Sequence, residues 1–326
     1  MHIKLFLAGL FMLVMVDCEA SESVQQQKHD ILYADPTIVL DNGKYYMTGT
    51  GSQTPPGFTV LVSDDLQKWT TGTSDYYRFI LHKGESYGET GFWAPQWLKE
   101  GDTYYFAYTA NEQTALARGT SITGPFMQNE LEPIDGSEKN IDPFLFKDDD
   151  GKYYLYHVRF NQGNYIWVAE FDMQTGAIKR ETLKQCLDCT EAWERTDNYA
   201  SDPIMEGPTV VKLDGKYYLF YSANHYMNID YAVGYATADS PFGPWKKYEG
   251  NPIIHRSIVG ENGSGHGDVF LGKDGGYYYI YHVHKSETKV SPRATRIIPL
   301  HLTKSNDGLY DISVKGDEVI KPYQLY

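Results

Sequence analysis

The 326-residue sequence has only three cysteines, and two of them form one Cys-x-x-Cys unit, Cys186 and Cys189. A metal site of that type usually needs a second pair of ligands, so a small disulfide or two free thiols is favoured over metal binding or a redox role. Basic residues are also scarce: 29 Lys and Arg oppose 43 Asp and Glu, which gives a net charge of -14. This balance argues against nucleic acid as a partner, because phosphate backbones bind to basic surfaces.

Long hydrophobic runs are absent after the N-terminus, and no long amphipathic helix pattern occurs. Residues 1–17 carry Lys4 and then an apolar run, which is typical of an export signal. Residues 18–30 form a polar tether that starts at Cys18, and either a lipid anchor on Cys18 or simple cleavage near Ala20 fits this arrangement. Both endings predict an exported protein that is periplasmic, extracellular or an outer-membrane lipoprotein.

Tyrosine is abundant, with 28 residues, and 30 Gly and 15 Pro indicate many turns. One unit recurs five times: a short strand, a tight turn rich in Asp, Asn and Gly, and a strand that begins near a Tyr-Tyr pair. The first tyrosines of these pairs are Tyr45, Tyr104, Tyr153, Tyr217 and Tyr277, separated by 59, 49, 64 and 60 residues.

Weaker strand patterns follow each of these hairpins. The repeat therefore predicts an all-β fold, a five-bladed β-propeller with four antiparallel strands per blade, as a single domain over residues 31–326. Two packed β-sandwiches would not explain one hairpin repeated along the whole chain.

Counting back from each tyrosine predicts which side chains share a position in the blades. Eleven residues before the last four tyrosines, and ten before Tyr45, stand Trp93, Asp142, Glu206, His266 and Asp35. Because the first strand of each blade lines the central channel, we expect these side chains to meet at one end of it. Such a ring of ionisable groups is costly to bury unless the groups are paired or used.

Prolines next to the carboxylates predict rigid backbone around them. Pro36 and Pro143 follow an aspartate directly, and Pro208 follows Glu206 by two residues. Two such carboxylates suit glycoside hydrolysis, in which one protonates the leaving oxygen and the other activates water. The clustering itself would keep one carboxyl protonated near neutral pH.

The motifs that carry these residues are Ala34-Asp35-Pro36, Trp93-Ala94-Pro95, Ile141-Asp142-Pro143, Glu206-Gly207-Pro208 and Gly265-His266-Gly267. With them the chain resembles glycoside hydrolase family 43 from Tyr33 to about Leu300. The resemblance implies an inverting enzyme that needs no cofactor for its chemistry. It makes Asp35 the general base, Glu206 the general acid, and Asp142 the residue that orients Glu206 and raises its pKa. For an inverting pair we expect a separation of about 6.5–9.5 Å.

Further site residues follow from the same resemblance. His266 matches a channel histidine that lies beside a bound calcium ion or an ordered water, although calcium prefers several oxygen ligands. An arginine that reaches the sugar is either Arg293 or Arg296, and Arg296 matches slightly better; a salt-bridged edge-strand arginine is the alternative for both. The predicted sugar-stacking residues are Phe92 and Trp93, with blade packing as the alternative, and Tyr226 and His225 are predicted at the rim. Gln96 stands where the family frequently has an acidic residue. We expect this difference to affect contacts with the substrate rather than the chemistry.

The predicted substrate is a plant polysaccharide or oligosaccharide. The sequence ends soon after the fifth repeat without an additional β-sandwich, and this favours an exo-acting α-L-arabinofuranosidase. A β-xylosidase, an endo-arabinanase and a galactofuranosidase remain open, because loops such as residues 71–91 and 183–200 shape the pocket. A non-catalytic carbohydrate-binding propeller is the alternative from another class, and the sequence predicts no oligomeric state.

Overall fold

The computed structural model of the protein describes residues 27–72 and 79–325. The predicted signal peptide at residues 1–17, Cys18 and most of the predicted tether lie outside the described residues, so export and lipidation stay predictions. Within the described ranges, no helix has the length and apolar character needed to cross a membrane.

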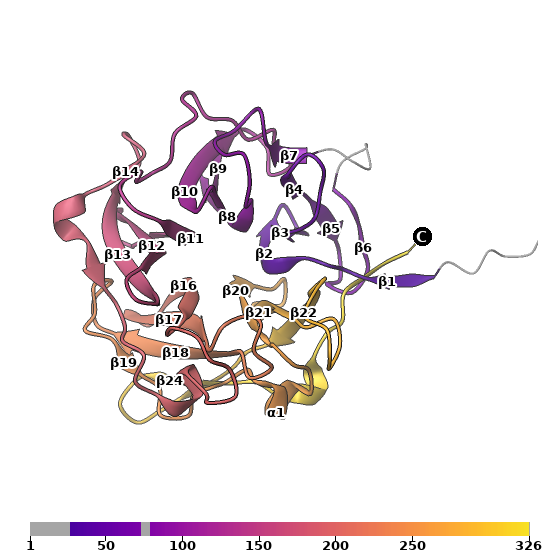
Figure 1. The fold of residues 1–326 in the computed structure, drawn as a ribbon, viewed down its shortest axis with the longest axis vertical. Helices are drawn as coiled ribbons and strands as arrows, with labels where there is room; N and C mark the ends of the chain where they lie inside the picture. Colours follow the sequence, from indigo (N-terminus) through magenta and orange to yellow (C-terminus); the bar gives the residue numbers. More distant parts are fainter. Residues whose placement is uncertain (1–26, 73–78, 326) are drawn as a thin grey trace, which may run out of the picture.

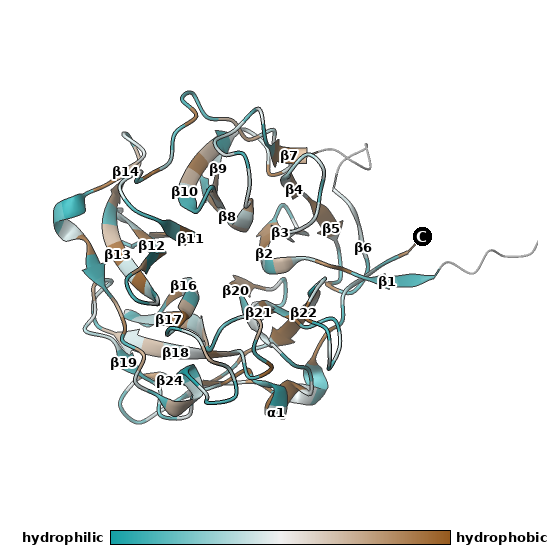
Figure 2. Cartoon of the chain, in the orientation of Figure 1, coloured by the Kyte–Doolittle hydropathy of each residue, from teal (hydrophilic) through white to brown (hydrophobic). Residues whose placement is uncertain are grey.

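Five antiparallel sheets surround a central axis like the blades of a wheel, in chain order (Figure 1). This confirms the predicted all-β, five-bladed propeller. Figure 2 shows hydrophobic residues concentrated along the strands and hydrophilic residues in many of the outer loops. The core therefore lies within and between the blades.

Two of the sheets have the predicted four strands in simple order. The first sheet contains β2 (Ala34–Asp41), β3 (Lys44–Thr50), β5 (Leu61–Ser63) and β6 (Trp69–Thr71). The fourth contains β16 (Met205–Leu213), β17 (Lys216–Ala223), β18 (Ala232–Ala238) and β19 (Lys246–Lys247).

The other three sheets depart from four regular strands at their outer edges. The second has β8 (Trp93–Glu100), β9 (Thr103–Ala110) and β10 (Gln113–Gly119), and the fifth has β20 (Gly265–Leu271), β21 (Tyr277–Val283) and β22 (Ala294–Pro299). The third has β11 (Asn140–Lys147), β12 (Tyr153–Phe160) and β13 (Asn164–Asp172), whose outer edge pairs with both β14 (Ala177–Ile178) and β15 (Lys184–Gln185). In the second sheet the outer position is reduced to one bridge, Arg118 to Met127, because Gly124 and Pro125 interrupt the segment between them.

Smaller elements complete the described chain. Three two-stranded pairs are β4 (Gly57–Thr59) with β7 (Phe79–His82), β23 (His301–Lys304) with β24 (Tyr310–Ser313), and β1 (Lys28–Asp30) with β25 (Tyr323–Leu325). The helical turns are η1 (Arg180–Thr182), η2 (Ala192–Glu194), α1 (Arg256–Val259) and η3 (Gly316–Glu318). The pairing of β1 with β25 brings two distant parts of the chain together beside the first blade.

Tight turns join the first two strands of several blades, as the sequence predicts. Asn42 and Gly43 both have positive φ, 46° and 75°, and so do Asp214 and Gly215, 47° and 80°. Two consecutive residues in this region make the type I′ turn, whose twist matches that of the strands it joins.

Three of the repeated tyrosines tie their blade to the one before it. Tyr104 donates a hydrogen bond to Asp41 of the first blade (2.9 Å), Tyr153 to Glu100 of the second (2.8 Å), and Tyr217 to Asp148 of the third (2.5 Å). A lysine in the first strand of the same blade binds the same carboxylate in each case: Lys99, Lys147 and Lys212. In the first blade the Tyr45 hydroxyl instead accepts from the backbone N–H of Lys273 (2.7 Å), which joins the fifth blade to the first.

Cys186 and Cys189 are both free thiols, so the two-thiol interpretation holds in the structure. Burial raises the pKa of the Cys186 thiol well above its ordinary value. The neutral thiol is a poor nucleophile and a poor metal ligand.

The tyrosine links predict a stability difference between two matched variants. Tyr217→Phe removes a hydrogen bond to a buried carboxylate, and we expect it to lower the free energy of unfolding by about 1–2 kcal/mol in urea titrations. Tyr277→Phe is the control, because within the described ranges no carboxylate pairs with the Tyr277 hydroxyl. Equal decreases in the free energy of unfolding of the two variants would show that these links do not stabilise the propeller.

Candidate active site

Every inner strand contains a register shift at the same place, and one residue there has a left-handed backbone. These residues are Asp35 (φ 46°), Ala94 (44°), Asp142 (55°), Gly207 (59°) and His266 (44°). Positive φ is strained for residues other than glycine, and such strain concentrates at functional sites. In four blades a proline follows and keeps the bulge rigid.

The predicted blade positions of Trp93 and Glu206 were off by one residue. The true equivalents of Asp35 are Ala94 and Gly207, which directly follow them. Turn length is the cause: the first, second and fourth blades have two-residue turns, whereas the third and fifth have longer ones. A fixed count back from each tyrosine therefore overshoots by one residue in the second and fourth blades.

His266 lies between two of the predicted carboxylates. Its Nδ1 is 3.5 Å from Asp35 Oδ1, and its Nε2 is 3.9 Å from Asp142 Oδ2. The backbone N–H of Gly207 donates to Asp142 Oδ2 (3.1 Å). A Cβ atom on Gly207 would lie 2.8 Å from the His266 ring, so the fourth blade needs glycine here. Residues from three blades thus surround one imidazole.

Asp35 is the most strongly paired carboxylate of the site. Arg293 Nη1 donates to its Oδ1 (2.9 Å), and the Thr50 hydroxyl donates to its Oδ2 (2.6 Å). Its backbone N–H donates to His282 Nδ1 (3.2 Å). Burial alone would raise the pKa of Asp35, but the Arg293 guanidinium and the neighbouring imidazoles hold it well below its ordinary value. Asp35 is therefore ionised at neutral pH, as a general base must be.

Glu206 approaches the same centre from the strand residue before the bulge. It is buried, and its Oε1 accepts a hydrogen bond from the Tyr231 hydroxyl (2.8 Å). Burial raises the pKa of Asp142, and the charges of Glu206 and Asp35 raise it further against the opposing effect of His266. The three carboxylates are thus close enough to interact. The predicted separation of Asp35 and Glu206 stays a prediction.

A calcium ion or an ordered water beside His266 stays a prediction. Among residues 27–72 and 79–325 there is no group of three or more His, Cys, Asp or Glu arranged to hold a metal. Burial would lower the pKa of His266, but the charges of Asp142 and Asp35 raise it above the ordinary value. A cavity of about 20 Å³, lined by Asp35, Asp142, His266 and Asp268 among others, has room for about one water.

The preference for Arg296 over Arg293 is corrected by the structure. Arg296 is buried and makes a bidentate pair with Glu261 (2.9 and 2.8 Å), which is the salt-bridged alternative considered from the sequence. Arg293, three residues earlier, reaches Asp35 and lies over the Tyr226 ring, 4.7 Å from its centroid. Arg293 is thus the arginine at the site.

Phe92 does not reach the surface of the site, contrary to its predicted stacking role. It is buried and stacks on Tyr108 (5.9 Å, 9°), so it belongs to the packing of the second blade. Trp93 is 38% exposed and Tyr226 is 36% exposed, and both remain available to a sugar. His225 stacks on Tyr226 at 5.0 Å.

Several residues of the site were not predicted from the sequence. Thr50, His282 and Tyr231 each bind a predicted carboxylate or its backbone, yet none belongs to the repeated motif. Thr50 and His282 each lie five residues after a repeated tyrosine, Tyr45 and Tyr277, so this spacing could have found them. Tyr231 lies in the loop before β18, where no such spacing exists. Gln96, flagged as a departure in substrate contacts, instead accepts from the backbone N–H of Leu145 in the next blade (3.2 Å).

The two arginines predict different phenotypes. Arg293→Ala removes the cation that holds the Asp35 pKa down, so the acidic limb of the kcat/KM profile should move to higher pH and activity should fall about 10- to 100-fold. Arg296→Ala should instead lower the free energy of unfolding by about 1–3 kcal/mol, with the pH profile of the folded enzyme unchanged. An unchanged acidic limb in Arg293→Ala would contradict its assignment to Asp35.

Several known proteins are similar to this chain over most of its length. A solved structure of an endo-1,4-β-xylanase from Bacteroides thetaiotaomicron VPI-5482 is 41% identical, covers 92% of this chain and 100% of its own, and has a TM-score of 0.83. The β-D-galactofuranosidase xynD of Aspergillus niger is 26% identical over 311 residues, which are 88% of this chain and 84% of that protein. A putative β-xylosidase of Escherichia coli (strain K12) is 26% identical over 76% of this chain, which spans only 47% of that relative.

The family itself follows from a match along most of the chain. The family model described as "Glycosyl hydrolases family 43" matches residues 29–308, a range that holds every carboxylate of the site. The chain therefore belongs to glycoside hydrolase family 43.

Proposed function

We propose that the protein hydrolyses glycosidic bonds with inversion, with Asp35 as the general base and Glu206 as the general acid. The observation that carries this is the convergence of Asp35, Asp142 and Glu206, from three different blades, around His266. Burying three carboxylates costs free energy, and such clusters are typical of sites that move protons. A non-catalytic carbohydrate-binding propeller would have no use for a base and an acid held in this way.

Asp35 is suited to activate water. Its ionised carboxylate would take a proton from a water molecule while the water oxygen bonds to the anomeric carbon. Arg293 and Thr50 hold the two oxygens of Asp35, so the direction of proton transfer is fixed before substrate binds. This arrangement needs no metal or cofactor for the step.

Glu206 would complete the reaction on the other side of the bond. It gives its proton to the glycosidic oxygen as the bond from that oxygen to the anomeric carbon breaks. The products are a free sugar of inverted configuration and the leaving alcohol. Asp142 binds the backbone N–H of Gly207, next to Glu206, and so supports the position of the acid.

For the substrate we propose a terminal α-L-arabinofuranosyl unit of a plant polysaccharide or oligosaccharide, removed by exo action. The galactofuranosidase of Aspergillus niger is similar to this protein over 88% of the present chain. β-D-Galactofuranose has the same ring configuration as α-L-arabinofuranose, so one pocket can suit both rings. Export from the cytoplasm, which the N-terminal sequence predicts, would bring the enzyme to such polymers.

A xylan-derived substrate is the second candidate. The 41% identical structure is described as an endo-1,4-β-xylanase, and it matches the full length of its own chain. Xylose and arabinose units occur together in plant xylans, so the two candidates are best separated by activity on defined substrates.

We expect release of nitrophenol from nitrophenyl α-L-arabinofuranoside to exceed release from the β-D-xyloside and β-D-galactofuranoside.

Proton NMR during the reaction should show the β anomer of arabinose first, because inversion converts an α bond to a β product. Appearance of the α anomer first would rule out the inverting mechanism.

Isosteric variants test the assigned roles. Asp35→Asn and Glu206→Gln should lower kcat on arabinan-derived oligosaccharides by about 100- to 10,000-fold. Glu100→Gln, which changes the carboxylate at the end of β8 in the second blade, is the control and should stay near wild type. Glycan binding without turnover of any plant glycan or aryl glycoside by the wild type would favour the carbohydrate-binding alternative.

A further inference from the structure

Tyr231 is the buried side chain that contacts the proposed acid directly. It lies just before β18 and has no exposed surface. Its hydroxyl donates to Glu206 Oε1 (2.8 Å). Burial and the charge of Glu206 raise the pKa of Tyr231 well above its ordinary value, so it remains a hydrogen-bond donor at any working pH.

Contacts with two residues of the fifth blade, His282 and Gly265, hold the Tyr231 ring in place. It stacks on His282, with centroids 5.8 Å apart and planes 18° apart, and His282 in turn accepts from the backbone N–H of Asp35. On another side lies Gly265, where a Cβ atom would be only 2.4 Å from the Tyr231 ring. The phenol therefore contacts the acid with its hydroxyl and the base side of the site with its ring.

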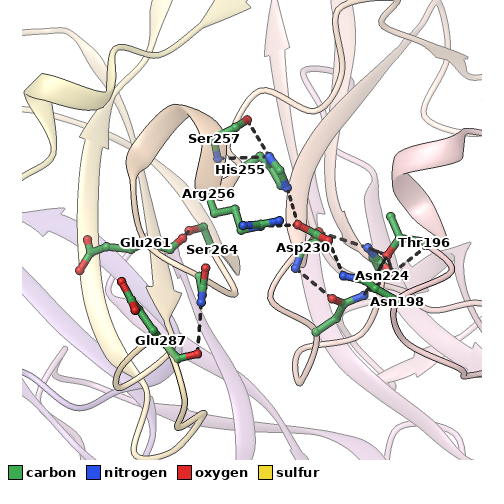
Figure 3. A network of polar contacts seen from close by, with 12 residues as sticks. Thr196, Asn198, Asn224, Asp230, His255, Arg256, Ser257, Glu261, Ser264 and Glu287 are labelled. Atoms are coloured by element: carbon green, nitrogen blue, oxygen red, sulfur yellow. Dashed lines mark hydrogen bonds and ion pairs between the residues drawn. The ribbon is translucent and has the colours of Figure 1, made fainter.

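The backbone before Tyr231 is fastened by a polar cluster centred on Asp230 (Figure 3). The Asp230 carboxylate accepts hydrogen bonds from Arg256 and from Asn198 (2.6 Å), and lies 3.2 Å from His255 Nε2. Arg256 and His255 belong to the segment around α1, and Asn198 belongs to the loop before β16. Two separate loops thus meet at the residue next to Tyr231.

Hydrogen bonds within the same segment complete this support. Asn228 Oδ1 accepts from the backbone N–H of Asp230 (3.0 Å), and the Asn228 carbonyl accepts from the backbone N–H of Tyr231 (3.1 Å). The Asn224 side chain donates to the Asp230 carbonyl (3.3 Å) and binds Thr196. The position of Tyr231 is therefore set by several elements and does not depend on one contact.

We propose that Tyr231 is the positioning residue of the general acid. Its hydroxyl donates a hydrogen bond to Glu206 Oε1, so Oε2 is the oxygen that delivers the proton. This rests on the proposed role of Glu206. In the reaction the proton passes from Oε2 to the glycosidic oxygen, the bond from that oxygen to the anomeric carbon breaks, and Glu206 becomes a carboxylate. Tyr231 keeps its own proton throughout.

The hydrogen bond from Tyr231 should strengthen as the reaction proceeds. Hydrogen bonds to an ionised acceptor are about twice as strong as those between neutral groups. Negative charge develops on Glu206 only as the proton leaves, so the contact stabilises the transition state more than the bound substrate. The benefit should be large when the leaving group needs a proton and small when it does not.

Leaving-group dependence is therefore the decisive test. With Tyr231→Phe, kcat/KM on an unactivated alkyl or oligosaccharide arabinofuranoside should fall about 10- to 100-fold. On 2,4-dinitrophenyl arabinofuranoside, whose leaving group departs without protonation, the change should stay within about threefold. Glu206→Gln is measured on the same pair of substrates and should show the same pattern with larger losses.

Tyr281→Phe is the matched control. Its hydroxyl is equally buried, in β21 of the fifth blade, and has no hydrogen-bond partner among the described residues, so both substrates should react as with wild type. Thermal melts confirm that each variant is folded. If Tyr231→Phe does not fold, Asp230→Asn weakens the supporting cluster and should give the same leaving-group pattern with smaller losses.

The outcomes separate this inference from the proposed function. If Glu206→Gln shows the leaving-group pattern but Tyr231→Phe loses equally on both substrates, or loses nothing, Tyr231 does not position the acid. If Glu206→Gln itself loses equally on both substrates, Glu206 is not the acid, and the proposed function fails first.

Discussion

A left-handed backbone bulge in each inner strand is the constraint on which the site depends. It places Asp35, Asp142 and His266 at the same height in three blades, and in the fourth it demands Gly207 so that His266 has room. The strain of positive φ is tolerated because the blades on either side, linked by tyrosine and carboxylate pairs, hold the wheel together.

Charge balance makes this crowded centre possible. Three buried carboxylates would repel one another, but His266 lies between two of them and Arg293 pairs with Asp35. The result is an asymmetric site, in which cations hold Asp35 ionised while burial favours the protonated form of Asp142. This difference in environment keeps Asp35 ionised and available as the proposed base.

The fold and the central carboxylates could be predicted from the sequence because they belong to a repeated unit. A fixed count back from each tyrosine ignores differences in turn length. It therefore placed Trp93 and Glu206 one residue before the true position in the blade. Arg293 lies just before β22 and Arg296 lies within it, and their different partners, Asp35 and Glu261, are set by three-dimensional packing. Tyr231 lies in a loop whose course is set by contacts of Asp230 with distant segments, and no local pattern records them.

A crystal structure of the Glu206→Gln variant with an arabinofuranosyl oligosaccharide tests the central claim most directly. The terminal sugar should lie over His266, with its anomeric carbon between Asp35 and residue 206 and a water molecule on the Asp35 carboxylate. A saccharide bound elsewhere, or one whose anomeric carbon has no access to Asp35, would contradict the assignment of this carboxylate cluster as the catalytic centre.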